Sequence, residues 1–242
     1  MKDNFSVQSA GYAKFRPTYP QELYDFLFSL VSAHHTAWDC ATGNGQVATV
    51  LAEHFTEVFG TDISENQLAH AVQKDNITYL LQSSDRSSFA DQTFDLITVA
   101  QAIHWFDFSA FYAEVKRTLK PGGVIAVFGY GVMQIDEQVD IIIHKLYKTI
   151  LGHYWDDERK FIDQGYQTLP FPFRESTVPE LYIKTSWNFD QLIGYLNTWS
   201  AVQHYEKANN SSPIDLVISE LYATWGAGEK EVKFPILLKV GQ

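Results

Sequence analysis

A glycine-rich loop followed by a second carboxylate is the first feature of this sequence that could do chemistry. In the segment WDCATGNG an apolar run ends at Asp39, and small residues continue to Gly45. A strand that turns through glycines into a helix lets the backbone pass close to a nucleotide-like ligand. Asp62 lies about 20 residues beyond the glycines, where a carboxylate can accept both hydroxyls of a ribose. The spacing predicts a cofactor site.

The loop fits two cofactor templates. Gly43-x-Gly45-x-x-Ala48 matches the dinucleotide fingerprint, in which a helix N-terminus faces a pyrophosphate. The run of small residues after Asp39 instead resembles the first motif of the class I S-adenosylmethionine-dependent methyltransferases. That cofactor has no phosphate, so small residues would serve close approach to its amino acid and its ribose. Asp39 would be an odd neighbour for a pyrophosphate.

The later motifs continue the methyltransferase resemblance in order and spacing. VFGTDIS ends a second strand, YLLQSSDRSSFADQTFDLITVAQAIHWF holds two closely spaced motifs, and KPGG precedes a fifth strand. The similarity covers about residues 5–130. It implies that S-adenosylmethionine is the cofactor and S-adenosylhomocysteine the product. The residues that it implies in cofactor binding are Tyr12, Arg16, Asp39, Ala41, Thr42, Gly43, Gly45, Asp62, Ile63, Ser83, Ser84, Gln101 and Ala102.

Two further stretches narrow the resemblance, and two positions depart from it. AGYAKFRPTYP and IGYLNTWSAVQHY resemble the small-molecule methyltransferases related to trans-aconitate methyltransferase. Ala41 stands where a first glycine is usual, and Ser83 replaces an aspartate often found at the adenine amine. Only glycine relaxes the backbone freely, but alanine is small and serine can still form a hydrogen bond. We expect cofactor binding to survive both changes.

Methyl transfer from a sulfonium mainly requires alignment of a nucleophile against an activated methyl group. A carboxylate acceptor would need no base. A hydroxyl, amine or carbanion-like carbon would need one, and His104 is the first candidate for general base or substrate contact. Arg16 could clamp a carboxylate of the cofactor or of an acidic substrate, with Tyr12 as a lid beside it. The remaining candidate substrate contacts are Trp105, Trp199, which could instead be a core residue, and His204.

Two rival functions stay open from the sequence. A nicotinamide-dependent oxidoreductase would use the same loop, and Tyr112-x-x-x-Lys116 mimics a dehydrogenase pair, although Tyr112 is expected to pack on the sheet. A non-catalytic S-adenosylmethionine-binding protein would bind the cofactor without turnover. No metal site is expected, because the histidines at 34–35 and 104 lack the companion ligands of a metal set.

Composition limits the partners and the compartment. The 242 residues carry a formal net charge of −11, and their longest basic cluster is short, so no nucleic-acid partner is expected. Cys40 is the one cysteine, which excludes an intrachain disulfide. No stretch has the apolar core of a signal peptide or the length of a membrane helix. We therefore expect a cytoplasmic monomer or homodimer that acts on a small molecule and has no membrane partner.

Apolar periodicity predicts an α/β fold with a doubly wound, mostly parallel seven-stranded sheet, helices on both faces and a helical cap inserted in the C-terminal half. Strands are predicted at 36–40, 57–61, 77–82, 94–100, 124–130, 180–188 and 230–240, and helices at 21–32, 45–54, 65–73, 107–119, 136–150, 189–205 and 213–225. Residues 151–177 read as an aromatic loop, and Pro235 predicts an edge or a bulge. The single domain 1–242 would comprise an N-terminal lid and helix (1–35), a cofactor-binding core (36–130), cap helices (131–178 and 189–226) and final strands (179–188 and 229–240).

Overall fold

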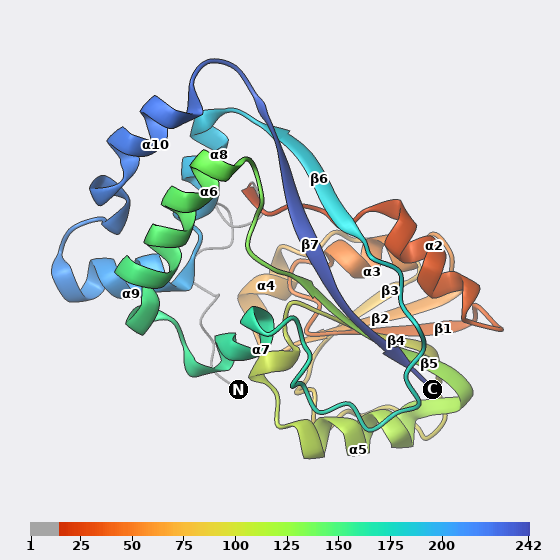
Figure 1. Ribbon diagram of the computed structural model, residues 1–242. Coiled ribbons are helices and arrows are strands. Elements are labelled where there is room, and N and C mark those ends of the chain that lie inside the picture. Colours follow the sequence, from red (N-terminus) through yellow and green to blue (C-terminus); the bar gives the residue numbers. More distant parts are fainter. Residues whose placement is uncertain (1–14) are drawn as a thin grey trace.

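A mostly parallel sheet of seven strands forms the centre of the computed structural model, which describes residues 15–242 (Figure 1). The strand order is β3-β2-β1-β4-β5-β7-β6. The parallel strands are β1 (Thr36–Cys40), β2 (Glu57–Asp62), β3 (Ile77–Leu81), β4 (Phe94–Ala100) and β5 (Leu119–Tyr130). Two antiparallel strands complete the sheet, namely β7 (Lys230–Gly241) and β6 (Tyr182–Trp187). The predicted fold class is confirmed.

Alternating side chains along the parallel strands build a core on each face of the sheet. Ala37 and Leu96 point to the face covered by α2 (Gln21–Ser29) and α3 (Gln46–Leu51). Trp38 and Ile97 point to the other face, which α5 (Phe108–Thr118) covers (Figure 1). Successive strand residues face opposite sides, so a sheet with helices on both faces needs continuous apolar strands. β4, whose first six residues are buried, has this pattern.

Short polar side chains fix where the helices begin. Ser64 accepts a hydrogen bond from the backbone of Gln67 and caps α4 (Glu65–Ala69). Aspartates cap α5 and α6 (Glu137–His144) in the same way, and Asn188 forms a capping box at α8 (Phe189–Leu196). Each such cap satisfies backbone N–H groups that have no partner within the helix.

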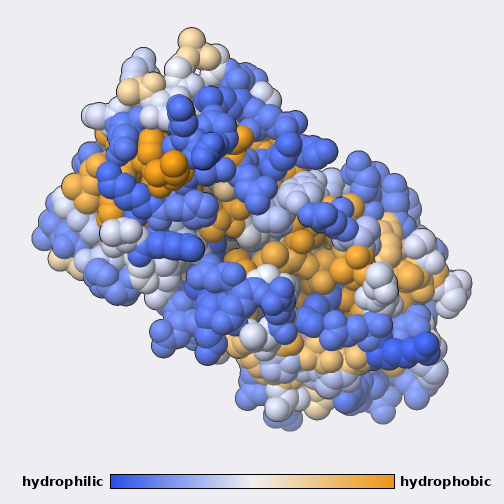
Figure 2. Space-filling view, in the orientation of Figure 1, coloured by the Kyte–Doolittle hydropathy of each residue, from blue (hydrophilic) through white to orange (hydrophobic). Residues whose placement is uncertain are grey.

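Two parts of the chain between β5 and β7, residues 131–163 and 188–229, form a cap at the carboxyl ends of the parallel strands (Figure 1). The segment between them runs back along the sheet, where Glu175 bridges to Gly241, and then enters β6. β6 and β7 reach from the sheet to this cap. Figure 2 shows hydrophilic side chains over most of this face of the molecule, with apolar patches on both parts. The cap contains α6, the π-helical turn η2 (Lys145–Ile150), the short turns η3 (Gly152–Tyr154), η4 (Asp157–Arg159) and η5 (Pro213–Leu216), and the helices α7 (Lys160–Asp163), α8, α9 (Ser200–Asn209) and α10 (Ile218–Trp225).

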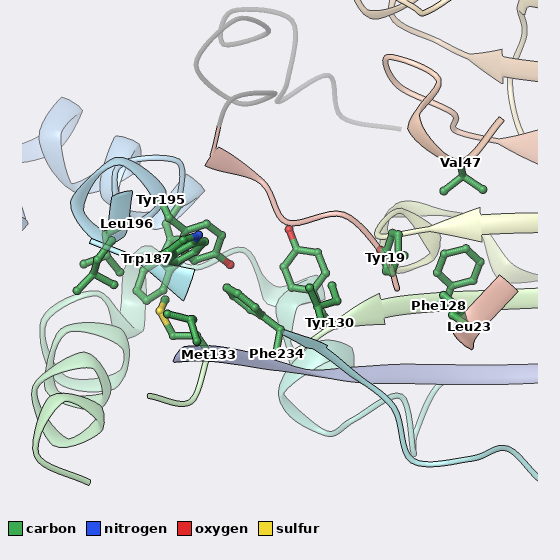
Figure 3. Packing of buried hydrophobic residues seen from close by; sticks show 14 of the residues in the cluster. Tyr19, Leu23, Val47, Phe128, Tyr130, Met133, Trp187, Tyr195, Leu196 and Phe234 are labelled. Atoms are coloured by element: carbon green, nitrogen blue, oxygen red, sulfur yellow. The ribbon is translucent and has the colours of Figure 1, made fainter. Parts of the chain in front are cut away.

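One apolar cluster joins the cap to the sheet. The ring centroid of Phe234 on β7 lies 5.3 Å from that of Tyr195 on α8 and 5.4 Å from that of Tyr130 on β5. The ring centroids of Tyr130 and Tyr19 are 6.1 Å apart. Tyr19 packs edge-on against Phe128, with 4.8 Å between their ring centroids. Figure 3 shows these rings running from the cap to the sheet. Because buried aromatic area is a large stabilising contribution, the cap and the sheet share one core.

Two predicted element boundaries were wrong. KPGG does not precede the fifth strand. It forms a bulge inside β5, where the pairing passes from Phe94–Leu119 to Leu96–Val124. The helix predicted over 189–205 breaks into α8 and α9, because Thr198 donates its hydroxyl hydrogen bond back to Tyr195 and ends α8.

Pro235 is not on an edge strand, because β7 lies between β5 and β6. The first half of β7 pairs with β6, and its second half pairs with β5 from Ile236 onward. Pro235 stands at the point where the pairing partner of β7 changes from β6 to β5. The N–H that proline lacks is therefore missing at the end of a hydrogen-bonded ladder and not within one. The predicted aromatic loop over 151–177 also contains the short helices η3, η4 and α7.

We predict that Phe234→Ala lowers the free energy of unfolding by about 3–5 kcal/mol, since Phe234 is fully buried between cap and sheet. Urea denaturation followed by tryptophan fluorescence measures this loss. Ile141→Ala is the control, because Ile141 on α6 is 63% exposed and its loss should change stability by no more than about 0.5 kcal/mol. A Phe234→Ala variant as stable as the control would contradict the shared core.

Candidate functional site

A pocket opens at the carboxyl ends of β1, β2 and β4, where the predicted cofactor loop lies. Trp105, which was expected to contact substrate, also lines it. Among the predicted cofactor residues, those that line the pocket are Arg16, Asp39, Ala41, Thr42, Gly43, Asp62, Ile63, Gln101 and Ala102. Gly45 is the N-cap residue of α3 and does not line the pocket, and Tyr12 lies outside the described residues. The fold thus brings most of these residues together around one pocket.

Ser83 and Ser84 are the exceptions to this grouping. Ser83 forms an isolated bridge with Arg86 and donates a hydrogen bond to Asp85, and Ser84 is buried in the same turn. Neither is among the described residues that line the pocket. Their assignment to the adenine edge stays a prediction.

The carboxylate of Asp39 holds the loop from beneath. Its Oδ2 accepts hydrogen bonds from the Thr42 hydroxyl at 2.5 Å and from the Ala48 backbone at 3.1 Å. Its Oδ1 accepts from the Thr98 hydroxyl at 2.8 Å. Burial, which leaves Asp39 1% exposed, raises the pKa of this carboxyl to about 6, and the hydrogen bonds partly oppose that rise. Asp39 therefore acts on the shape of the loop.

The loop takes a left-handed backbone conformation at alternate residues. The φ angles are 57° at Ala41, 56° at Gly43 and 81° at Gly45. Glycine adopts such angles freely, whereas alanine meets a cost of roughly 1–2 kcal/mol. This explains physically why a glycine is usual at the position of Ala41.

Gly45 is required for a second reason, which is close packing. A Cβ at this position would lie 2.1 Å from the hydroxyl oxygen of Tyr79 on β3. Tyr79 donates a hydrogen bond to the carbonyl of Val72, which fixes the ring against the loop. No sequence motif indicated Tyr79, because its role depends on packing between β3 and the loop after β1.

Asp62 ties two loops together at the wall of the pocket. Its Oδ2 accepts from the backbone N–H of Gly43, and its Oδ1 accepts from that of Ser64, both at 2.9 Å. The carboxylate is thereby oriented by the same loop that Asp39 holds. This position is compatible with the predicted binding of ribose hydroxyls.

A second chamber lies between the end of the sheet and the cap. Its shared wall with the first pocket consists of Arg16, Gln101, Trp105 and Tyr130. The cap side is aromatic and includes Trp199, a predicted substrate contact. The other described residues that line it are His104, Trp155, Asp156, Arg159, Ile162, Tyr195 and Ser200. His204 is not among them, and its Nδ1 lies 2.8 Å from the carbonyl of Tyr154.

Gln101 lines both pockets, and its backbone and side chain are held by neighbouring strand residues. Its φ is 54°, and its backbone N–H donates to the carbonyl of Phe128 at 2.8 Å. The side-chain Nε2 donates to the carbonyl of Tyr130. The buried Oε1 has no hydrogen-bond partner among the described residues, so it has acceptor capacity left for a ligand.

His104 lies in the chamber as an uncharged imidazole. It belongs to the short turn η1 (Ile103–Trp105), is 7% exposed, and its Nδ1 has no hydrogen-bond partner in the described part of the chain. Burial lowers the pKa of His104 to about 3, and the positive charges of Arg159 and Arg16 add to this effect. At neutral pH the ring carries no charge and is a weak base.

Two arginines supply the positive charge of the chamber. Arg16 donates from Nη1 to the hydroxyl of Tyr130 at 2.9 Å. Arg159 donates from Nε to the hydroxyl of Tyr147 at 2.8 Å, and its guanidinium carbon lies 4.6 Å from the ring centroid of Trp155. No hydrogen bond from an Arg159 Nη atom to a described residue is present. Arg159 is thus held by Nε and by stacking, with its terminal nitrogens available to an anion.

Arg159 was not among the predicted site residues, because it lies in the stretch predicted to be a loop. One signal was present, namely the spacing Trp155-x-x-x-Arg159, which can place a cation beside an aromatic ring on a helical turn. Nothing in the sequence indicated that this turn would face the end of the sheet.

The rival dehydrogenase pair is not assembled as a site. Tyr112 donates its hydroxyl hydrogen bond to the carbonyl of Pro170 at 2.7 Å, and Lys116 lies over the ring of Phe173. None of these four residues lines either of the two pockets. Within residues 15–242, no group of histidine, cysteine, aspartate or glutamate side chains is arranged to hold a metal ion. Over the same range, no helix has the length and apolarity to cross a membrane.

Comparison with known proteins gives a consistent result. Residues 38–127 match the family model described as a methyltransferase domain. A Dictyostelium discoideum protein with a provisional methyltransferase name is 34% identical over 98% of this chain and 93% of its own length. A Saccharomyces cerevisiae protein, provisionally named an S-adenosylmethionine-dependent methyltransferase, is 23% identical over 90% of this chain and 88% of its own.

The similarity extends to solved structures. One from Anaeromyxobacter dehalogenans, provisionally named a type II methyltransferase, has a TM-score of 0.88 and 36% identity, and the match covers 94% of this chain and 98% of that one. The agreement includes the cap as well as the sheet, because nearly the whole chain is covered. The predicted trans-aconitate methyltransferase-like subgroup stays a prediction.

We predict that Gly45→Ala weakens the binding of S-adenosylmethionine by about tenfold or more, because a Cβ would displace Tyr79 and the loop. Isothermal titration calorimetry measures this change. Gly122→Ala is a matched control, since Gly122 also has a positive φ, 77°, but an added Cβ would meet nothing within 4 Å. Equal affinity for the two variants would show that the contact with Tyr79 is unimportant.

The pKa of His104 predicts a loss of stability on acidification. The pKa is lower in the folded chain than in the unfolded chain, so the unfolded chain takes up a proton first as the pH falls below about 6.5. His104→Gln removes this effect. Unfolding free energies measured from about pH 7 to pH 4.5 should therefore fall more steeply for the wild type, by up to about 1.4 kcal/mol per pH unit. If the unfolding free energies of the wild type and of His104→Gln changed with pH in parallel, His104 would not be a buried neutral imidazole.

Proposed function

This chain belongs to the class I S-adenosylmethionine-dependent methyltransferases, and we propose that it methylates the carboxylate of a small organic acid. The activity is methyl transfer, and the cofactor is S-adenosylmethionine. The acceptor is the part that we infer. The single observation that carries this inference is the guanidinium of Arg159 in the chamber next to the cofactor loop.

The first pocket has the donor set that this cofactor requires. The backbone of Ala41, Thr42 and Gly43 allows close approach, and Asp62 provides a carboxylate for hydroxyls. Gln101 Oε1 and Arg16 lie at the wall toward the chamber. When bound, S-adenosylmethionine supplies a methyl group that its sulfonium has already activated. The task of the protein is then to place a nucleophile in line with it.

The charged residues that line the chamber are Arg16, Arg159 and Asp156, so its lining has a net charge of +1, which favours an anionic acceptor. Arg159 can donate two parallel hydrogen bonds to a carboxylate from its Nη atoms, and Arg16 adds a second positive charge at the shared wall. The net charge of the whole chain is −11, so attraction of an anion depends on these local groups. An acid that reaches the chamber would exchange hydrogen bonds with water for hydrogen bonds with the Arg159 guanidinium.

The neutral state of His104 points to the same acceptor. With a pKa of about 3, this imidazole removes a proton poorly from a hydroxyl or an amine at neutral pH. A carboxylic acid with an ordinary pKa near about 4 is ionised without help. We therefore assign His104 to the chamber wall and not to proton transfer.

Aromatic side chains make the rest of the chamber suitable for an apolar body. Trp105, Trp155, Tyr195 and Trp199 line it, and Trp155 and Trp199 have ring centroids 5.5 Å apart. Such a lining suits an acid with an aromatic or aliphatic group.

The remaining proposals concern the setting of the enzyme. We infer a cytoplasmic protein that acts as a monomer or homodimer and has no nucleic-acid partner. The lone cysteine and the charge of −11 favour this setting. The division into lid, cofactor core, cap and final strands is likewise our proposal.

A labelled-methyl assay tests the acceptor. The purified protein is incubated with methyl-tritiated S-adenosylmethionine and a panel of aromatic and aliphatic acids, each paired with its primary alcohol and its primary amide. We expect label in base-labile methyl esters of one or more acids and none in the paired compounds. Label in the alcohols or amides alone would overturn the acid proposal. Binding of the cofactor with no labelled product in any class would favour the non-catalytic alternative.

For an acid found in this way, we predict that Arg159→Gln lowers kcat/KM by about tenfold to a hundredfold, the effect of losing hydrogen bonds to a charged group. Lys160→Gln is the matched control, because Lys160 is the next cation along the chain and is not among the described residues of the chamber. Calorimetry should show unchanged affinity for S-adenosylhomocysteine in both variants. A wild-type kcat/KM in Arg159→Gln would remove Arg159 from the site.

A further inference from the structure

Gly194 on α8 is a glycine inside a helix, where glycine is a poor helix former. The reason for its presence is a close contact with the N-terminal segment. A Cβ at Gly194 would lie 2.4, 2.6 and 2.7 Å from three carbons of the Phe15 ring. Favourable carbon–carbon contacts are about 3.5–4.0 Å long, so no side chain fits at position 194 while Phe15 occupies this place.

The contact with Gly194 anchors one end of a short segment that crosses from the cap to the sheet. The other end is anchored by Tyr19, whose ring packs edge-on against Phe128 on β5. Arg16 lies between these anchors and follows Phe15 directly. Its guanidinium reaches the hydroxyl of Tyr130 at 2.9 Å, and Figure 3 shows Tyr19 and Tyr130 next to each other at the end of the sheet.

Arg16 is one of the residues that line both the cofactor pocket and the chamber. A shift of Phe15 away from α8 would therefore move a charged group at the boundary between them. α8 itself is held in the cap by the buried residues Leu192, Tyr195 and Leu196. A side chain added at Gly194 would accordingly displace Phe15 and not α8.

We propose that Gly194 is a positioning residue, which receives the Phe15 ring and so sets the place of Arg16 at the boundary of the two pockets. The contact also makes the affinity for the cofactor depend on where α8 of the cap lies. This proposal is independent of the identity of the acceptor, because it can be tested with the cofactor product alone.

Gly194→Ala separates positioning from ordinary structural support. Alanine favours a helix more than glycine does, so a purely local view predicts a protein that is at least as stable. The positioning role predicts that S-adenosylhomocysteine binds about tenfold more weakly, while the thermal midpoint without ligand is not lowered. Calorimetric titration and thermal unfolding of the whole chain give the two readouts. Gly152→Ala is the control, because a Cβ at Gly152 in the cap would meet nothing within 4 Å.

A double-mutant cycle completes the test. Phe15→Ala should weaken binding by a similar factor, and Phe15→Ala with Gly194→Ala should bind no more weakly than Phe15→Ala alone, because the added methyl then meets no ring. Wild-type affinity in Gly194→Ala would overturn the proposal, and so would losses that multiply in the double variant. A fall in the thermal midpoint of Gly194→Ala in step with its affinity would also overturn it, since Gly194 would then be a structural residue only.

Discussion

The buried carboxylate of Asp39 is the interaction on which the site depends. Three donors surround it, from the loop after β1, from the start of α3 and from β4. Burial of a carboxylate is costly unless hydrogen bonds compensate it, and the raised pKa shows that compensation here is partial. The same bonds hold a backbone that is left-handed at Ala41, Gly43 and Gly45. The hydrogen bonds that offset the cost of burying the Asp39 carboxylate are therefore the same ones that hold the conformation of the loop.

The chamber depends on a different constraint, which is the continuity of the core. Phe234 and Tyr130 carry apolar packing from the sheet into the cap, so the cap has a fixed place over the strand ends. Only with the cap in that place does Arg159 meet the wall formed by residues of the sheet. The charge that we assign to acceptor recognition is therefore a product of tertiary packing.

The sequence was sufficient for the features that have local causes. Apolar strands, glycine turns and the cap at Ser64 follow from backbone geometry and periodicity, and all seven strands lie where they were expected to within a few residues, apart from the KPGG bulge. The loop residues Asp39 to Gly43 and Asp62 were found because their spacing follows from the strand–turn–helix unit. Their roles in binding stay predictions.

The features that were missed have non-local causes. Arg159 faces the chamber because of packing between segments far apart in the sequence, and Tyr79 supports Gly45 from a neighbouring strand. Thr198 ends α8 by a hydrogen bond that competes with helical periodicity. Pro235 is tolerated because two partner strands divide β7 between them. None of these is visible in a window of neighbouring residues.

The way in which the cap joins the sheet has an evolutionary consequence. The chain leaves β5 after Tyr130 and returns along β7, and Tyr130 pairs with Ile236 while the N–H of Gly131 donates to the carbonyl of Pro235. Departure and return are therefore adjacent in space, which is the condition under which insertions are tolerated well. The intervening segment can diverge or be exchanged while the strands β1 to β4 and their loops keep their geometry. New acceptors can arise in this way without rebuilding the part of the protein that holds the methyl donor.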